Sequence, residues 1–162
     1  SMRWLRATNA EAVSHLRRAA AAHDVEPDRL LFADFVPRVQ HLARHAAADL
    51  FLDTFPYGAH TTTNDALLAG LPVLTCAGET LVSRLAGSQL HAIGLPELVT
   101  ANFAAYEALA LRLATEAPLL SDLRARLAAN RHTHPLFDMA RYTQDFEALL
   151  LHTWDERHRL GP

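Results

Sequence analysis

The chain has 162 residues, of which half are hydrophobic and a fifth are charged; this is typical of a folded globular protein and excludes an intrinsically disordered one. Its formal net charge of -3 provides no basic excess, so we expect neither nucleic acid nor an anionic membrane surface as a partner. No apolar stretch reaches the roughly 18 to 20 residues of a membrane span, and no signal segment opens the chain. A soluble, unexported protein is therefore predicted.

Short apolar runs alternate with helical patterns in the first part of the chain. This alternation predicts an α/β fold in which crossover helices flank a parallel sheet. The predicted strands are Arg3 to Arg6, Leu30 to Asp34, Leu50 to Leu52 and Val73 to Cys76. Because the one cysteine, Cys76, lies in the last of these runs, the sequence indicates a buried thiol, and a cytoplasmic location fits it.

Two helices are predicted between the first three strands. Thr8 and Glu11 have the spacing of a capping box, and the helix that they open is expected to end near His23. Pro37 suits the first position of the second helix, and the alanine-rich sequence that follows favours helix up to Asp49.

From about Leu81 onward the pattern is almost wholly helical. The helices expected there are Phe103 to Ala114, Pro118 to Asn130 and Tyr142 to Arg157. We therefore predict one α/β domain over residues 3–162 with a helical C-terminal tail. Residues 1 and 2, Ser and Met, are interpreted as a remnant of a tag or vector.

The segment His60 to Asp65 is the first candidate site. It follows a loop rich in proline and glycine, and a helix is predicted to begin at Thr61 or Thr62 and to stop at Gly70. Free N–H groups and the dipole at a helix start attract phosphate, and threonine hydroxyls add donors. The competing interpretation is that these threonines only cap the helix.

The second candidate site is the basic helix face of Arg38, His41 and Arg44, which repeat at i, i+3 and i+6. A nucleotide needs a flat ring over its base and arginine forks for oxygen atoms. The alternative is an exposed face that only solubilises the helix. Since both candidate helices follow strands, we expect them to open on one edge of one parallel sheet.

At these residues the sequence resembles the C-terminal catalytic lobe of the O-GlcNAc transferase family, including SPINDLY-like proteins and bacterial relatives. The segments that carry the resemblance are PRVQHLARHAAADLFLDT (37–54), GAHTTTNDALLAGLPVLT (58–75), GETLVSRLAGSQL (78–90) and HPLFD (134–138). The resemblance implies the C-terminal half of a GT-B fold, with a Rossmann-like parallel sheet and flanking helices. Thr63 and Asn64 depart from it, since relatives often carry glycine and an apolar residue there.

The resemblance also implies a role for each position of a UDP site. His41 would stack on the uracil, Arg44 would support the base, and Val36 would offer it backbone polar groups. The diphosphate would be held by Thr61 and Thr62, with His60 beside them. Asp65 would lie near the ribose and near Arg38, which stands as arginine in place of a family lysine; a surface Asp–Arg pair is the alternative for Asp65.

By the same resemblance, the full-length enzyme would transfer a sugar from UDP-GlcNAc or UDP-glucose to protein serine or threonine, with inversion and without a metal or other cofactor. The resemblance further implies an N-terminal lobe with the acceptor site and a diphosphate-binding lysine upstream of this chain. We assign no catalytic residue within these 162 residues, and we expect that they do not transfer a sugar on their own.

Other classes of function stay open at this point. A non-catalytic α/β module could bind a nucleotide or another anion at the same helix start. An interaction domain could use the apolar stripe of Phe146, Leu149, Leu150 and Trp154. The histidine pairs along the chain offer two metal ligands at most, without a cysteine or carboxylate pair to complete a tetrahedral set, so no metal site is predicted.

Overall fold

The first strand of the chain, β1 (Arg3–Leu5), pairs in parallel with β2 (Leu30–Phe32). The computed structural model describes residues 3–5 and 9–159, and the chain divides into a unit of residues 1–41 and a unit of residues 42–162. The α/β class predicted from the alternating pattern is confirmed.

Helix α1 (Ala10–Ala22) and the short helix η1 (Pro27–Arg29) connect the two strands of the first unit. Asn9 begins α1, because its side chain accepts a 2.7 Å hydrogen bond from the N–H of Ala12. The predicted cap, Thr8, lies outside the described residues. The predicted end near His23 is confirmed, since His23 is the C-cap residue.

Helix α2 (Arg38–His45) begins next to Pro37 as predicted but ends before the expected Asp49. The alanines that follow His45 prefer helix intrinsically, but this preference does not extend α2 beyond His45. The N–H groups of Ala47 and Ala48 donate to carbonyls only three residues earlier, at 3.1 Å each, and these tight turns redirect the chain into the next strand.

The second unit contains a parallel sheet in the order β3-β4-β5, made of β3 (Phe51–Leu52), β4 (Val73–Cys76) and β5 (Val99–Thr100). All four residues of the central strand β4 are buried, including Cys76, as expected; the cytoplasmic location stays a prediction. The described strands pair in two sets, β1 with β2 in the first unit and β3-β4-β5 in the second.

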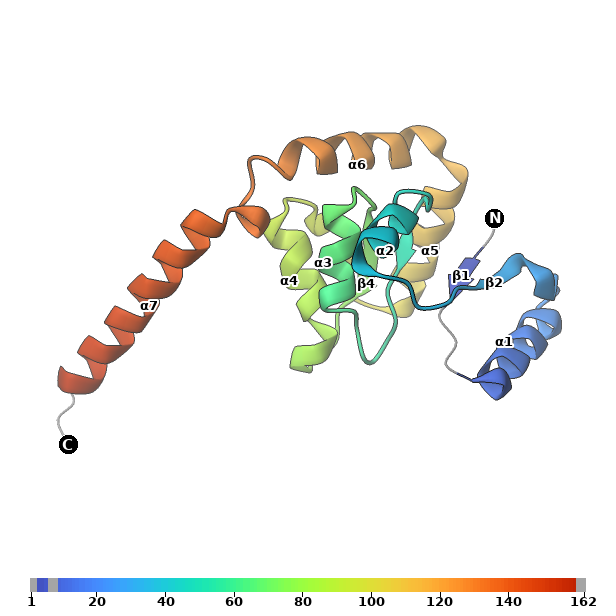
Figure 1. Ribbon diagram of the computed structural model, residues 1–162, viewed down its shortest axis with the longest axis horizontal. Helices are drawn as coiled ribbons and strands as arrows, with labels where there is room; N and C mark the ends of the chain where they lie inside the picture. The colour runs from blue at the N-terminus through green and yellow to red at the C-terminus, as the bar shows by residue number, and fades with distance from the viewer. Residues whose placement is uncertain (1–2, 6–8, 160–162) are drawn as a thin grey trace. The chain divides into compact units, whose positions relative to one another are not determined.

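Helices α3 (Thr61–Leu68), α4 (Leu85–Ala92) and α5 (Phe103–Thr115) contact β4. In Figure 1, α3 and α4 lie on one side of this strand and α5 on the other. The short helices η2 (Leu81–Ser83) and η3 (Pro96–Leu98) flank α4. The core that these elements enclose consists mainly of leucines with no exposed surface, among them Leu67, Leu74, Leu90, Leu98 and Leu127. Burying each such side chain contributes about 1.5–3 kcal/mol.

Helix α3 ends as the sequence predicts. Gly70 has a positive φ of 84°, a left-handed conformation that favours glycine. The N–H of Gly70 donates to Leu67 and the N–H of Leu71 donates to Ala66, at 3.1 and 2.9 Å. This pattern closes the last turn of the helix and sends the chain directly into β4.

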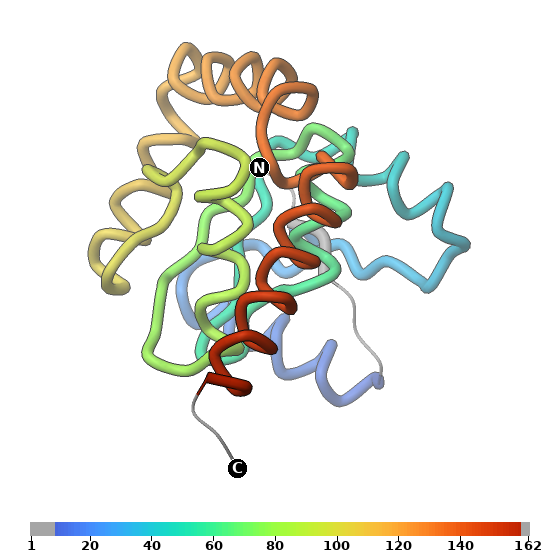
Figure 2. Tube along the Cα trace, turned by 90° about the vertical axis from the view of Figure 1, so that its left-hand side faces the viewer, coloured from blue at the N-terminus to red at the C-terminus, as the bar shows by residue number. Residues whose placement is uncertain are grey.

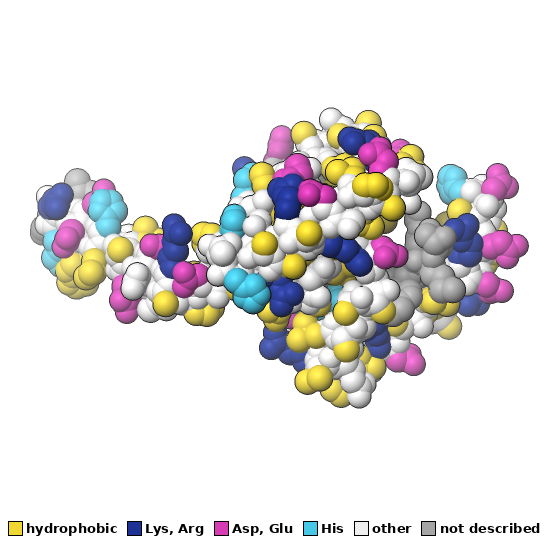
Figure 3. All heavy atoms as spheres, turned by 90° about the horizontal axis from the view of Figure 1, so that it is seen from above, with side chains coloured by type: hydrophobic (Ala, Val, Ile, Leu, Met, Phe, Trp, Pro, Cys, Tyr) yellow, Lys and Arg dark blue, Asp and Glu magenta, His cyan; other side chains and the backbone are white. Residues whose placement is uncertain are grey.

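The C-terminal part consists of α6 (Ala117–Asn130), η4 (Pro135–Phe137) and α7 (Met139–Arg159). The three helices predicted in the tail are confirmed, with bounds that differ by up to three residues. Within the second unit α7 runs away from the sheet (Figure 1) and lies in front of the other helices of this unit in Figure 2; none of its residues is buried. Hydrophobic side chains are visible along it (Figure 3). In the described part of the chain, no helix has the length and apolar character needed to cross a membrane.

Candidate functional site

The loop that leaves β3 is held by the carboxylate of Asp53, which is 7% exposed. Its Oδ1 accepts hydrogen bonds from the N–H groups of Thr54 and Ala59, at 2.8 and 2.7 Å. Its Oδ2 accepts one from the hydroxyl of Thr75 on β4, at 2.7 Å. Three hydrogen-bond donors therefore surround this carboxyl group. The residues from Asp53 to Ala59 are thereby closed into a fixed loop.

Gly58 occupies the tightest point of this loop. Its N–H donates to the carbonyl of Val82 at 3.3 Å. A Cβ at this position would lie 3.1 Å from both the Val82 carbonyl oxygen and Oδ2 of Asp53, which is closer than ordinary van der Waals contact. Glycine is therefore required here for space, since the backbone passes directly against the carboxylate.

The start of helix α3 has no side-chain cap. His60 is its N-cap residue, and its side chain makes no capping hydrogen bond, whereas the caps of α1 and α5 are closed by Asn9 and Asn102. The interpretation that the threonines cap the helix is therefore wrong. Thr61 and Thr62, the first two residues of the helix, are exposed, and they lie at the positive end of the helix dipole.

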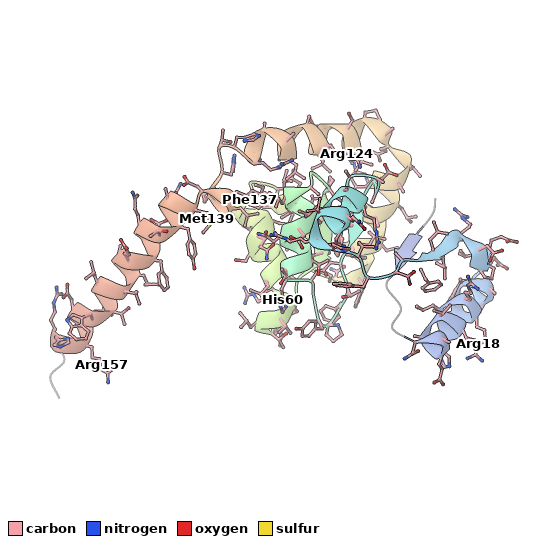
Figure 4. All side chains as sticks on the ribbon, viewed as in Figure 1. Arg18, His60, Arg124, Phe137, Met139 and Arg157 are labelled. Atoms are coloured by element: carbon pink, nitrogen blue, oxygen red, sulfur yellow. The ribbon has the colours of Figure 1, made fainter. Side chains whose placement is uncertain are left out.

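His60 is fixed by neighbours from two other elements. Its Nε2 lies 3.3 Å from the carbonyl oxygen of Val82, a contact that requires the proton on Nε2. Its backbone carbonyl accepts a 3.1 Å hydrogen bond from the side-chain amide of Gln89 on α4. The ring of Tyr57 lies against the imidazole, with 5.1 Å between centroids. His60 lies at the start of α3 in Figure 4.

An open pocket of about 410 Å³ lies at this helix start. The residues that line it are Phe51, Asp53, Thr54, Tyr57, Gly58, Ala59, His60, Thr61 and Thr62. It lies beyond the carboxyl end of β3, which is where ligands bind in open α/β sheets. His60, Thr61 and Thr62 were predicted from the sequence as site residues, and the structure places these three together.

Asp53, Tyr57 and Gly58 were not predicted as site residues, although each lines this pocket. An aspartate directly after an apolar strand and before a proline and glycine loop was the available signal for Asp53. The contact with Thr75 could not be found in the same way, because it joins positions 22 residues apart in sequence. The exposed Tyr57 gave no signal, since a loop tyrosine has no periodicity.

The buried polar residues of α3 are Thr63 and Asp65, at 0% and 8% exposure. Asp65 is therefore a buried residue of this helix. Its predicted role near a ribose stays a prediction. Thr63 donates a 3.0 Å hydrogen bond from its hydroxyl to the carbonyl of Ala59, so it too contributes to the position of the helix start.

Arg38, His41 and Arg44 lie on one helix, α2, as predicted. Val36 precedes this helix. The division between the two units falls after His41, so Val36, Arg38 and His41 belong to the first unit and Arg44 to the second. The prediction that these side chains meet the start of α3 stays a prediction.

Metal ligation has no basis in the geometry of the described residues, among which no three His, Cys, Asp or Glu side chains form a group that could hold an ion. None of the described residues lining the pocket is lysine or arginine. An anion bound there would depend on backbone N–H groups, hydroxyls and the helix dipole, together with any cation supplied by another part of the protein.

The sequence matches the model of glycosyl transferase family 41 over residues 1–146. It is 36% identical over 161 residues to the UDP-N-acetylglucosamine–peptide N-acetylglucosaminyltransferase of Caenorhabditis elegans, covering 99% of this chain and 14% of that protein. It is also 36% identical over 153 residues to a probable enzyme of this kind from Arabidopsis thaliana, covering 94% of this chain and 16% of that protein.

The fold is similar to a solved structure of a mutant O-GlcNAc transferase from Thermobaculum terrenum. The TM-score is 0.87 with 30% sequence identity, and the match covers 95% of this chain and 30% of that chain. The chain thus spans less than a third of the length of each of these three proteins.

Proposed function

Because the chain belongs to glycosyl transferase family 41, we propose that it forms the nucleotide-sugar-binding part of an inverting glycosyltransferase that uses a UDP-sugar, chiefly UDP-GlcNAc, to modify protein serine or threonine. The observation that carries this proposal is the uncapped start of α3, where Thr61 and Thr62 are exposed in a pocket at the carboxyl edge of the sheet. The names of the relatives support the donor and the acceptor.

The diphosphate of the donor is proposed to bind at Thr61 and Thr62, next to His60. A helix start of this kind offers N–H donors and the positive end of a dipole, which suit a doubly charged group. The Asp53 carboxylate lines the same pocket and would repel an anion if it were unpaired. Its three hydrogen-bond donors spread that charge, so the pocket stays compatible with phosphate.

The nucleoside is proposed to be held by the residues of and near helix α2. His41 stacks on the uracil, Arg44 supports the base, and the backbone of Val36 offers hydrogen bonds to it. Arg38 and the buried Asp65 are assigned to the ribose side of the site. Family membership and the shared helix α2 support this assignment.

We propose that these 162 residues bind a UDP-sugar without transferring it. The matched region covers 30% of the bacterial O-GlcNAc transferase chain, so most of that enzyme has no counterpart in the match. Among the described residues lining the pocket there is also no lysine or arginine, and stabilising a departing diphosphate requires donors or cations placed around it.

Titration of UDP, UDP-GlcNAc and UDP-glucose into the wild type and His41→Ala tests the proposal. Loss of base stacking, worth about 1–3 kcal/mol, should weaken all three ligands about 5-fold to 150-fold. His15→Ala removes an exposed helix histidine of the same unit and should bind like the wild type. Absence of any binding would indicate a module for another anion, and transfer of sugar to an acceptor peptide would contradict the proposed inactivity.

A further inference from the structure

We propose that Thr63, together with the buried pair of Asp53 and Thr75, positions the start of helix α3 so that its first-turn N–H groups receive the donor diphosphate. This inference rests on the proposed function, because it assigns a role to residues beneath the same site. None of the three is assigned to contact the ligand. They act through the backbone of Ala59, the residue that precedes the N-cap His60.

Both polar backbone groups of Ala59 are held by side chains. Its N–H donates to Oδ1 of Asp53 at 2.7 Å, and its carbonyl accepts the hydroxyl proton of Thr63 at 3.0 Å. The N–H belongs to the peptide plane before the Cα of Ala59, and the carbonyl belongs to the plane after it. Because a hydrogen bond holds each plane, φ and ψ of Ala59 are restricted, and this sets the direction in which the next residues enter the helix.

The scaffold on which these bonds depend is itself rigid. Asp53 donates its own N–H to the carbonyl of Leu74 in β4 at 2.9 Å, and its carbonyl accepts a 2.9 Å hydrogen bond from the hydroxyl of Tyr106 in α5. Thr75, which holds the second carboxylate oxygen, is 1% exposed in the central strand. The backbone of Asp53 is thus fixed to β4 and α5, and its carboxylate is held to β4 by Thr75.

The burial of Thr63 indicates that it positions the helix and does not bind the ligand directly. Thr63 is 0% exposed, so its hydroxyl cannot reach a ligand in the pocket, and that hydroxyl is already used by Ala59. Thr61 and Thr62, one and two residues earlier, are exposed. The three threonines therefore divide into two that face the pocket and one that fixes the backbone beneath them.

Thr63→Val tests the inference, because valine keeps the size of threonine but cannot donate to Ala59. Losing one hydrogen bond should weaken UDP and inorganic diphosphate about threefold to tenfold. Uridine, which has no phosphate, should bind as to the wild type. Thr63→Ser retains the hydroxyl and should restore both affinities.

Thr115→Val is the matched control. The Thr115 hydroxyl also donates to a carbonyl four residues earlier, that of Leu111 at 2.8 Å, but Thr115 does not line the pocket. This variant should bind UDP, diphosphate and uridine like the wild type. If Thr63→Val does not fold, Thr75→Val, which removes the donor to the other carboxylate oxygen, takes its place in the same three titrations.

The outcomes distinguish this inference from the proposed function. A wild type that binds neither UDP nor diphosphate contradicts both. A wild type that binds both, with Thr63→Val equal to it, overturns the positioning role and leaves the proposed site intact. If Thr63→Val weakens uridine binding as much as UDP binding, the positioning role is also overturned. General damage to the fold, and not a displaced helix start, would then explain the weaker binding.

Discussion

Replacing Thr75 by valine should destabilise the second unit more than the same change at Thr100, although both threonines are buried in neighbouring strands. The hydroxyl of Thr75 donates to the Asp53 carboxylate at 2.7 Å, and that of Thr100 donates to a neutral backbone carbonyl at 3.1 Å. Valine matches the shape of threonine, so neither change opens a cavity. Each difference in stability therefore reports one hydrogen bond.

The expected magnitudes follow from the charge of the acceptor. A hydrogen bond to a charged group contributes about 1.5–3 kcal/mol, and one to a neutral group about 0.5–1.5 kcal/mol. With a urea dependence of about 2 kcal/mol per molar, the unfolding midpoint should fall by about 1 M for Thr75→Val and about half as much for Thr100→Val. Circular dichroism during urea unfolding measures both.

A double-mutant cycle checks the assignment. In an Asp53→Asn background the acceptor is neutral, so Thr75→Val should cost less than in the wild type. Equal costs for Thr75→Val and Thr100→Val, or no coupling between Thr75 and Asp53, would refute the reasoning that a buried carboxylate organises this loop.

Two further predictions concern the core and the surface of the second unit. Leu67→Ala removes a fully buried side chain and should lower the free energy of unfolding by about 2–5 kcal/mol; urea unfolding measures this, with the exposed Leu111→Ala as a control within about 0.5 kcal/mol of the wild type. Arg112 donates hydrogen bonds to the Glu116 carboxylate at 3.0 and 3.3 Å. These bonds, and to a smaller extent the Coulombic attraction of Arg112, hold the pKa of Glu116 below its ordinary value, although desolvation acts in the opposite direction. The stabilisation by this pair is therefore present at neutral pH and is lost as the pH falls through the lowered pKa. Arg112→Gln should return the Glu116 pKa towards its ordinary value, and an NMR titration of the carboxyl carbon that finds no change would contradict this.

The parts of the fold that the sequence predicts well are those with local signals. Strand Val73 to Cys76 agrees in both bounds, because a buried apolar run follows a glycine and proline stop. Helix α3 begins at Thr61 and ends before Gly70, as predicted. In each case neighbouring residues carry the whole signal, so no knowledge of the tertiary contacts is needed.

The parts that the sequence does not predict depend on contacts between distant residues. Strand β5, Val99–Thr100, is too short for periodicity and exists because it pairs with β4. The pairing partner of each strand has no local signal either, since an apolar run does not specify its partner. In the candidate site, the helix start is predictable, but the hydrogen bond from Thr75 to Asp53 is not, because it joins a strand to a loop residue 22 positions earlier.

An NMR titration of the isotope-labelled chain with UDP shows directly whether the start of α3 receives the donor diphosphate. We expect saturable changes in the backbone amide signals of Thr61 and Thr62, together with changes in the ring of His41. Inorganic diphosphate should reproduce the changes at the two threonines and leave the His41 ring unaffected. If UDP binds without changing the amides of Thr61 and Thr62, or does not bind at all, the start of α3 is not the diphosphate site.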